Sequence, residues 1–157
     1  MATNKARAAA LATLIAIPAE GIRQYAYYDP PGILTVCYGS TTNVQKNRYY
    51  TLKECEKRLS DDMRLAIDTV DRCVPGLPDE VLAAFGDAVY NVGPKIACDR
   101  KNSTAARYLY AGKLLEACNQ LPRWDKAKVL GVMVSLPGLT TRRGEEKKLC
   151  LSGLRSS

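Results

Sequence analysis

One segment, residues 20–39, constrains the fold and chemistry of this chain more than any other part of its sequence. It reads Glu-Gly-Ile-Arg-Gln-Tyr-Ala-Tyr-Tyr-Asp-Pro-Pro-Gly-Ile-Leu-Thr-Val-Cys-Tyr-Gly and places Glu20, Asp29 and Thr35 at fixed spacings. Pro-Pro-Gly directly after Asp29 predicts a turn, and the β-branched and apolar residues 33–38 predict a short strand. Two carboxyl groups and a hydroxyl around one turn indicate an active site.

The two carboxyl groups are expected in unlike surroundings. The apolar, alanine-rich run from Ala8 to Ala19 predicts a helix, with Glu20 where the run ends. Packed apolar surface there would disfavour an ionised carboxyl, as a general acid requires, whereas Asp29 stands beside a turn. Carboxyl groups in such different environments can act as an acid and a base, and glycoside hydrolysis uses such a pair.

The whole pattern, E-G-x-R-x-x-A-Y-x-D-x-x-G-x-x-T-x-x-Y-G, resembles the phage-type lysozymes, the endolysins of glycoside hydrolase family 24. The resemblance implies a catalytic triad of Glu20, Asp29 and Thr35. It extends to about Leu154, although only the first block is specific enough to carry the assignment alone. The later matching segments are the F/Y-N-x-G end at residues 84–93, the N/S-T pair at residues 102–104 and the R-R-x-x-E motif at residues 139–146.

The resemblance implies an α+β, mostly helical, lysozyme-like fold of two lobes, with a small N-terminal sheet, a helical C-terminal lobe and the cleft between them. It implies hydrolysis of the β-1,4 bond between N-acetylmuramic acid and N-acetylglucosamine in bacterial peptidoglycan, which causes host lysis and phage release. It also implies that an arginine lies beside the catalytic Glu, for which we favour Arg143. The substrate-binding residues expected besides Arg143 are Tyr90, Asn91, Ser103 and Thr104.

Structural interpretations of the same residues stay open at this point. A carboxylate at a helix end is ordinarily a surface group, Asp before Pro-Pro-Gly favours an Asx-turn, and Thr is common in strands. Tyr90 and Asn91 could pack and cap a helix that ends at Gly93, and the Arg142-Arg143 pair could be a solvated helix start. Trp124, the only tryptophan, is expected in the core.

The sequence departs from the family at Gly39-Ser40-Thr41, where Gly-His-Thr is usual, and the chain contains no histidine. A customary structural partner is therefore missing, while the proposed mechanism is unaffected. The absence of histidine excludes a Ser-His-Asp triad, a Cys-His dyad and a histidine-ligated zinc. We expect no metal and no organic cofactor, because nothing in the sequence gathers ligands for one.

With 157 residues, of which 46% are hydrophobic, the chain has the size of one globular domain. We expect a single lysozyme-like domain, with an N-terminal lobe at about 20–55, a connecting helix at about 51–72 and a helical C-terminal lobe at about 73–157. Further helices are predicted at residues 79–92, 103–112, 114–120 and 142–153, and a weaker one at residues 124–132.

Six cysteines without any C-x-x-C pair favour disulfides over a zinc or thioredoxin-type site, with buried reduced thiols as the alternative. Disulfides require an oxidising compartment such as the host periplasm. The sequence leaves all fifteen pairings open. Proximity within the predicted lobes favours Cys37 with Cys55, Cys73 with Cys98, and Cys118 with Cys150.

The net charge of +7 predicts attraction to anionic surfaces, and the anionic cell envelope would fit a lysozyme. We expect no nucleic acid partner, since the basic residues are scattered, and we expect a monomer. The run Ala8–Ala19 is preferred as the first helix of the folded domain rather than an export element, because it is closed by Pro18 and falls short of the roughly 20 residues that span a bilayer. A non-catalytic peptidoglycan-binding module and a basic protein that merely associates with anionic surfaces remain as alternatives.

Overall fold

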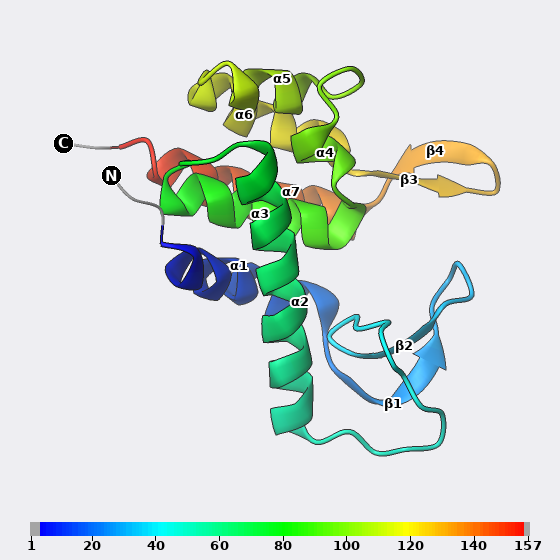
Figure 1. Ribbon diagram of the computed structural model, residues 1–157. Helices are drawn as coiled ribbons and strands as arrows, with labels where there is room; N and C mark the ends of the chain where they lie inside the picture. The colour runs from blue at the N-terminus through cyan, green and yellow to red at the C-terminus, as the bar shows by residue number, and fades with distance from the viewer. Residues whose placement is uncertain (1–3, 156–157) are drawn as a thin grey trace.

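The computed structural model describes residues 4–155, and helices dominate this part of the chain (Figure 1). The first half contains α1 (Lys5–Glu20), β1 (Arg23–Tyr28), β2 (Leu34–Cys37) and α2 (Leu52–Cys73). The second half contains α3 (Asp79–Val92), α4 (Lys95–Cys98), α5 (Thr104–Tyr110), α6 (Leu114–Gln120), the 3₁₀ helix η1 (Leu121–Trp124), β3 (Lys126–Val129), β4 (Val132–Ser135) and α7 (Pro137–Ser152). The predicted α+β, mostly helical class is confirmed.

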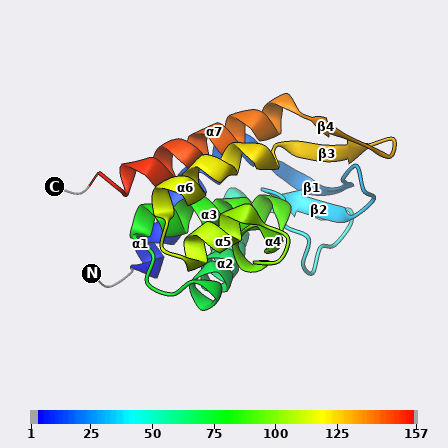
Figure 2. The ribbon, with the colours of Figure 1, turned by 90° about the horizontal axis from the view of Figure 1, so that it is seen from above.

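The long helix α2 connects the two lobes. Figure 1 shows β1 and β2 beside one end of α2, and α1 and the helices from α3 onward gathered around its other end. Helix α1 precedes the sheet in sequence but packs with the helical lobe, against α3, α2 and α7. In the view from above, the β1–β2 and β3–β4 strand pairs lie at the same end of the molecule (Figure 2).

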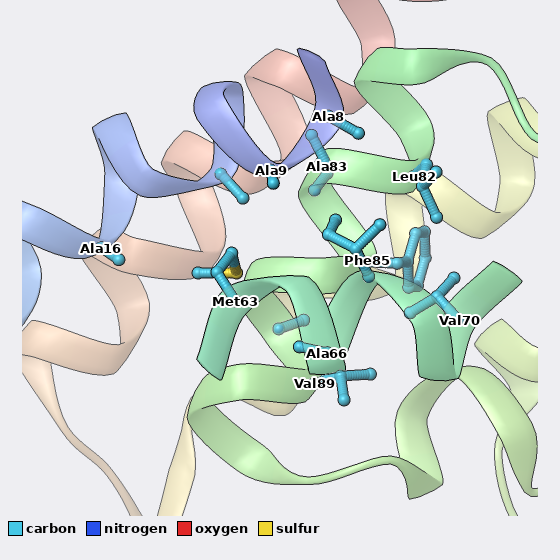
Figure 3. Packing of buried hydrophobic residues seen from close by; sticks show 14 of the residues in the cluster. Ala8, Ala9, Ala16, Met63, Ala66, Val70, Leu82, Ala83, Phe85 and Val89 are labelled. Carbon is cyan, nitrogen blue, oxygen red and sulfur yellow. The ribbon is translucent and has the colours of Figure 1, made fainter. Parts of the chain in front are cut away.

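The core forms where α1, α2 and α3 meet. Ala8, Ala12 and Ala16 of α1 are fully buried, and their spacing of four residues places them on one helix face. Small side chains on that face let α1 approach α3 closely. Figure 3 shows Met63 of α2 and Phe85 of α3 in the same interior. The predicted helix of the alanine-rich run is confirmed as part of the folded domain, while the expectation that the run is not an export element stays a prediction.

Local signals in the sequence explain most of the helix boundaries. Helix α2 begins with a capping box, in which the Glu54 backbone N–H donates to Thr51 Oγ1 at 3.1 Å and the Thr51 N–H donates to Glu54 Oε1 at 3.2 Å. The helices predicted at residues 51–72, 79–92 and 114–120 are confirmed within one residue at each end. Helix α7 begins earlier than predicted, because Pro137 occupies a first-turn position that favours helix initiation.

The predicted helix at residues 124–132 is wrong, since β3 and β4 form an antiparallel hairpin there. Lys-Ala-Lys-Val and Val-Met-Val-Ser alternate with a period of two and contain three β-branched valines, which favours strands. Leu130 and Gly131 between the strands both have positive φ, 51° and 82°. A two-residue turn of that kind matches the twist of a hairpin.

Three disulfides join elements that are distant in sequence, and all three favoured pairings are confirmed. Cys37–Cys55 ties β2 to α2, Cys73–Cys98 ties the end of α2 to α4, and Cys118–Cys150 ties α6 to α7. The first bridge belongs to the lobe that contains the sheet, and the third lies within the helical lobe. Among residues 4–155, no helix combines the length and the apolar character that crossing a membrane requires.

Candidate active site

The three residues of the predicted triad line one cleft of about 460 Å³. The structure therefore brings together groups that the sequence separates by up to 15 positions, from Glu20 to Thr35, and adds residues from α2 and α3. A larger, mostly apolar groove of about 570 Å³ runs between α1 and α7 and contains none of the triad. The lining of the first cleft comprises Glu20, Tyr27, Asp29, Pro30, Thr35, Gly39, Thr41, Thr42, Asp62, Tyr90 and Asn91.

Glu20, the last residue of α1, is held from two sides. A Cβ on Gly39 would lie 3.1 Å from Glu20 Oε1, so the backbone of Gly39 forms a wall directly against the carboxyl. Gly39 has φ +91°, a second reason why a side chain is disfavoured there. On the other side Arg142 Nη1 donates to Glu20 Oε2 at 2.7 Å. The Glu20 side chain is 22% exposed, so it is accessible from the cleft.

The arginine beside Glu20 is Arg142, and the expectation that Arg143 lies there is wrong. Arg143 is fully buried and does not line the cleft; it donates to Glu146 at 2.5 and 2.6 Å and to the Trp124 carbonyl at 3.4 Å. Successive residues of a helix point in directions about 100° apart, so only one of two adjacent arginines can face the cleft. The R-R-x-x-E pattern does not specify which one.

Arg142 is itself held by a buried carboxylate. Its Nε and Nη2 donate to the two oxygens of Asp87 at 2.9 and 2.8 Å, and both side chains are nearly or fully buried. Burial opposes the charge of Arg142, but the hydrogen bonds and attraction of Asp87 and Glu20 outweigh it and raise the pKa of the guanidinium above its usual range. This two-pronged pair orients Arg142 toward Glu20.

The charged chain continues into the helical lobe. Glu146 is fully buried, and burial raises the pKa of its carboxyl well above the usual range. A hydrogen bond with Asp87 raises this pKa further, while the attraction of Arg143 lowers it. A protonated Glu146 can donate to Asp87, so hydrogen bonds link Glu20 through Arg142 and Asp87 to Glu146 and Arg143. None of these inner partners could be assigned to Glu20 from the sequence.

Asp29 is positioned by its own turn. Its Oδ1 accepts from the Ile33 backbone N–H at 2.7 Å, its backbone N–H donates to the Ile33 carbonyl at 2.9 Å, and Gly32 N–H donates to the Asp29 carbonyl at 2.8 Å. The carboxyl is therefore held by its own turn, but through the N–H four residues on and not through the N–H two residues on that defines an Asx-turn. This bond is compatible with a chemical role. Within residues 4–155 no protein group donates to Asp29 Oδ2. That oxygen remains free to bind a water molecule.

Thr35 lies on β2 opposite Tyr27 of β1, and its side chain is almost completely buried in the wall of the cleft. Its hydroxyl donates to the Ile33 carbonyl at 2.9 Å. Ile33 thus accepts from Thr35 and donates to Asp29, which fixes the two side chains relative to each other. The oxygen lone pairs of Thr35 remain available to accept a hydrogen bond from a water molecule.

The last turn of α3 supplies Tyr90 and Asn91 to the cleft, as predicted for their position. The Tyr90 hydroxyl donates to the Tyr38 carbonyl at 2.7 Å, which fixes the ring against the sheet lobe. Burial, followed by the charge of Glu20, raises the pKa of Tyr90 above its usual range. Asn91 Oδ1 is buried and has no hydrogen-bond partner among the described protein groups. A buried amide oxygen normally accepts a hydrogen bond, so Asn91 Oδ1 can accept one from a ligand in the cleft.

Ser103 and Thr104 do not line the cleft, and this part of the expectation is corrected. Ser103 is buried and caps α5: its hydroxyl donates to the Ile96 carbonyl at 2.8 Å and accepts from the Ala106 N–H at 3.1 Å. Thr104 Oγ1 accepts from Arg107 at 2.9 Å on the surface of α5. The N/S-T pair therefore marks the start of a helix in the far part of the helical lobe.

Arg58 of α2 stabilises the loop in which serine replaces the usual histidine. It donates to Ser40 Oγ at 3.0 Å and to the carbonyls of Thr42 and Asn43 at 2.6 and 2.8 Å. Asp62, one turn further along α2, lines the cleft and was missed in the sequence. Burial raises the pKa of Asp62, although Ser40 and Arg58 oppose that shift. No local signal in the sequence marks Asp62 as a residue of the cleft.

Among the described residues there is no group of three or more His, Cys, Asp or Glu side chains that could hold a metal ion. The cleft instead presents carboxyl groups, hydroxyls and an amide. A carboxyl at a helix end facing a second carboxyl across a solvent-accessible cleft can supply a proton donor and a water-binding group. The fold and this site define a lysozyme-like glycoside hydrolase.

Comparison with known proteins agrees with this class. The sequence model of the family described as phage lysozyme matches residues 18–146, so the chain belongs to the phage lysozyme family. The SAR-endolysin of Pseudomonas phage phiKMV is 35% identical over 147 residues, which cover 93% of this chain and 88% of the relative. The enzyme is thus a glycoside hydrolase of the peptidoglycan-lysing endolysin type.

Solved structures show the same fold. The active form of the P1 phage endolysin Lyz superimposes with a TM-score of 0.79 at 24% identity, covering 99% of this chain and 88% of that one. The muramidase domain of SpmX from Asticaccaulis excentricus also gives a TM-score of 0.79, at 26% identity, covering 90% of this chain and 95% of that domain. The expected lysozyme-like fold is confirmed.

Proposed function

We propose that this endolysin hydrolyses the β-1,4 bond between N-acetylmuramic acid and N-acetylglucosamine, with Glu20 as general acid and with Asp29 and Thr35 positioning the attacking water. The observation that carries the proposal is the single cleft that holds all three side chains. The two carboxyl groups are held by different partners, Arg142 for Glu20 and the Ile33 backbone for Asp29. Different environments suit an acid and a base.

In this mechanism Glu20 donates its proton to the glycosidic oxygen as the bond breaks. Arg142 occupies Oε2, so Oε1, which faces Gly39, is the oxygen that carries the transferred proton. The guanidinium then stabilises the carboxylate that remains after transfer. General acid catalysis of this kind contributes about 10²–10⁴-fold to the rate.

Asp29 and Thr35 act on the opposite face of the sugar. Asp29 Oδ2 accepts a hydrogen bond from the water and takes its proton, while Thr35 Oγ1 fixes the water's orientation. We propose inversion at the anomeric carbon, because in this arrangement the water attacks from the face opposite the acid. This mechanism requires room for the water between Asp29 and the sugar, with carboxyl groups about 6.5–9.5 Å apart, whereas a retaining pair stands at roughly 5 Å.

Tyr90 and Asn91 are proposed to contact the glycan. The buried Asn91 Oδ1 would accept from an N-acetyl N–H or a hydroxyl of the saccharide, which gives it the missing donor. Tyr90 lines the cleft while its hydroxyl donates to the Tyr38 carbonyl. Arg142 takes the place that the sequence assigned to Arg143, as a group that touches Glu20.

The site of action proposed is the host periplasm. Three disulfides fit an oxidising compartment, and relatives of this chain are named SAR-endolysins. In the periplasm the chain would act as a monomer, a single lysozyme-like domain with the lobe boundaries given above. Its net charge of +7 would draw it to the anionic cell envelope, and its substrate is the glycan strand of peptidoglycan.

Product analysis tests this proposal directly. Peptidoglycan digested with the purified enzyme should yield muropeptides with hydrated reducing ends by mass spectrometry, and the first-formed anomer should be inverted by NMR. Anhydro ends would show lytic transglycosylation and would remove the water-positioning roles of Asp29 and Thr35. A retained anomer, together with a saccharide adduct on Asp29, would show a covalent mechanism.

A further inference from the structure

The β3–β4 hairpin exposes apolar side chains that the catalytic cleft does not use. Leu130 at its tip is 99% exposed, Val132 61%, Met133 57% and Val129 43%. Both ribbon views show the hairpin projecting beyond the helices, at the end of the molecule where the β1–β2 strands also lie (Figures 1 and 2). A contiguous row of exposed aliphatic residues on a projecting element marks an interaction surface.

The strand register separates this hairpin into two chemically different faces. Directly paired residues share a face, and the pairs Ala127–Val134 and Val129–Val132 make one face entirely apolar. The pairs Lys126–Ser135 and Lys128–Met133 give the other face two lysines and a serine beside the exposed Met133. Within the described part of the chain Lys128 forms no ion pair, and Lys126 approaches Asp125 at 3.5 Å.

The base of the hairpin is fixed while its tip is free. Asp125 Oδ2 accepts from the Thr140 hydroxyl at 2.8 Å, and the Leu136 N–H donates to the Asp125 carbonyl at 3.1 Å. Arg143 adds a bond to the Trp124 carbonyl. These contacts join both ends of the hairpin to the first turns of α7, so the exposed tip is presented in a defined direction by a rigid base.

The chemistry of the two hairpin faces fits an anionic bilayer better than a glycan strand. A glycan strand presents hydroxyls and amides, and an aliphatic face has neither donors nor acceptors for them. An anionic bilayer surface offers apolar acyl chains beneath a layer of negative headgroups, which suits an aliphatic tip flanked by lysines. We propose that the β3–β4 hairpin docks this endolysin on the surface of an anionic phospholipid bilayer. This surface is independent of the proposed catalytic roles.

Binding to vesicles tests the docking surface without reference to catalysis. The intact protein should co-sediment with vesicles of phosphatidylcholine containing about a third phosphatidylglycerol, and less with phosphatidylcholine alone, because each lysine near an anionic surface contributes about 1 kcal/mol. Leu130→Asp and Lys128→Glu should each weaken the binding at least about tenfold.

Matched controls separate the hairpin from the general positive charge. Lys148→Glu on α7 changes the net charge as Lys128→Glu does, and Leu65→Asp on α2 replaces another exposed leucine; each should weaken binding less than about threefold. Equal losses for Lys128→Glu and Lys148→Glu, or unchanged binding of Leu130→Asp, would overturn the proposal.

Two further measurements test other partners. If sedimentation velocity showed that the wild type self-associates and that Leu130→Asp abolishes this association, the proposal would be overturned and the partner would be a second copy of the chain. Turnover of soluble glycan fragments should be unchanged in both hairpin variants, and a loss would place the hairpin in substrate binding instead.

Discussion

The two walls of the catalytic cleft hold their carboxyl groups by different means. Asp29 is fixed by the backbone of Ile33, four residues away, within an exposed turn. Glu20 is fixed by Arg142, 122 residues away, and Arg142 is fixed by Asp87 inside the helical lobe. Local hydrogen bonds therefore position Asp29 on one wall, whereas buried charges distant in sequence position Glu20 on the other. It follows that substitutions in the turn should alter catalysis alone, whereas substitutions of the buried charges Arg142 and Asp87 should alter catalysis and stability together.

The largest effect is expected for Arg142→Met. The variant leaves Asp87 buried without its cation, and removing one partner of a buried pair costs about 3–5 kcal/mol. Urea unfolding should show this loss, and lytic activity should fall as well. Arg123→Met provides the control, because Arg123 is an exposed arginine that should change the free energy of unfolding by less than about 0.5 kcal/mol. Equal stability of the two variants would contradict the role of the buried charges.

Asp29→Asn should separate catalysis from stability on the other wall. The amide oxygen can still accept from the Ile33 N–H, so the free energy of unfolding should change by less than about 1 kcal/mol. Turnover on peptidoglycan should fall by about 10²–10⁴-fold, because the amide cannot take a proton from water. A stability loss as large as that of Arg142→Met would show that the turn is not held locally.

The pH dependence of stability provides a smaller test of the buried wall. Since the folded-state pKa of Glu146 is raised, the folded protein binds a proton that the unfolded chain releases near pH 4.5. The free energy of unfolding should therefore fall as the pH rises above this value, by about 1.4 kcal/mol for each pKa unit between the two states, until the folded pKa is passed.

Glu146→Gln should remove this contribution, because the neutral amide can imitate the protonated carboxyl toward Asp87. The exposed Glu145→Gln is the matched control and should retain the wild-type slope. Thermal unfolding between pH 5 and 8 in the three proteins measures the difference. Identical slopes in all three would mean that Glu146 is ionised when folded.

The same contrast explains what the sequence could and could not predict about the site. The proposed triad was implied by the resemblance of residues 20–39 alone, and its members lie around a turn and a strand, which are local structures. The choice between Arg142 and Arg143 depends on how α7 is rotated against α1 and α3, which only tertiary packing decides. The contribution of Asp62 was likewise invisible, since a carboxylate on α2 enters the cleft only once the sheet lobe folds beside it.

The fold shows the same division. Helices with strong local signals, such as the capping box of α2, were predicted within a residue. The segment at residues 124–132 has a weak helical composition, and its two-residue turn at Leu130 and Gly131 was not recognised. Ser103 was assigned to the cleft by resemblance alone, whereas its buried hydroxyl caps a helix.

Replacement of Glu20 by Gln tests the central claim most directly. Gln can keep the contact with Arg142 Nη1 through its amide oxygen but has no proton to transfer to the glycosidic oxygen. The turnover of purified Glu20→Gln on peptidoglycan should fall by about 10²–10⁴-fold, with circular dichroism and the unfolding midpoint close to those of the wild type. Near-normal turnover of a correctly folded Glu20→Gln enzyme would contradict the assignment of Glu20 as the general acid.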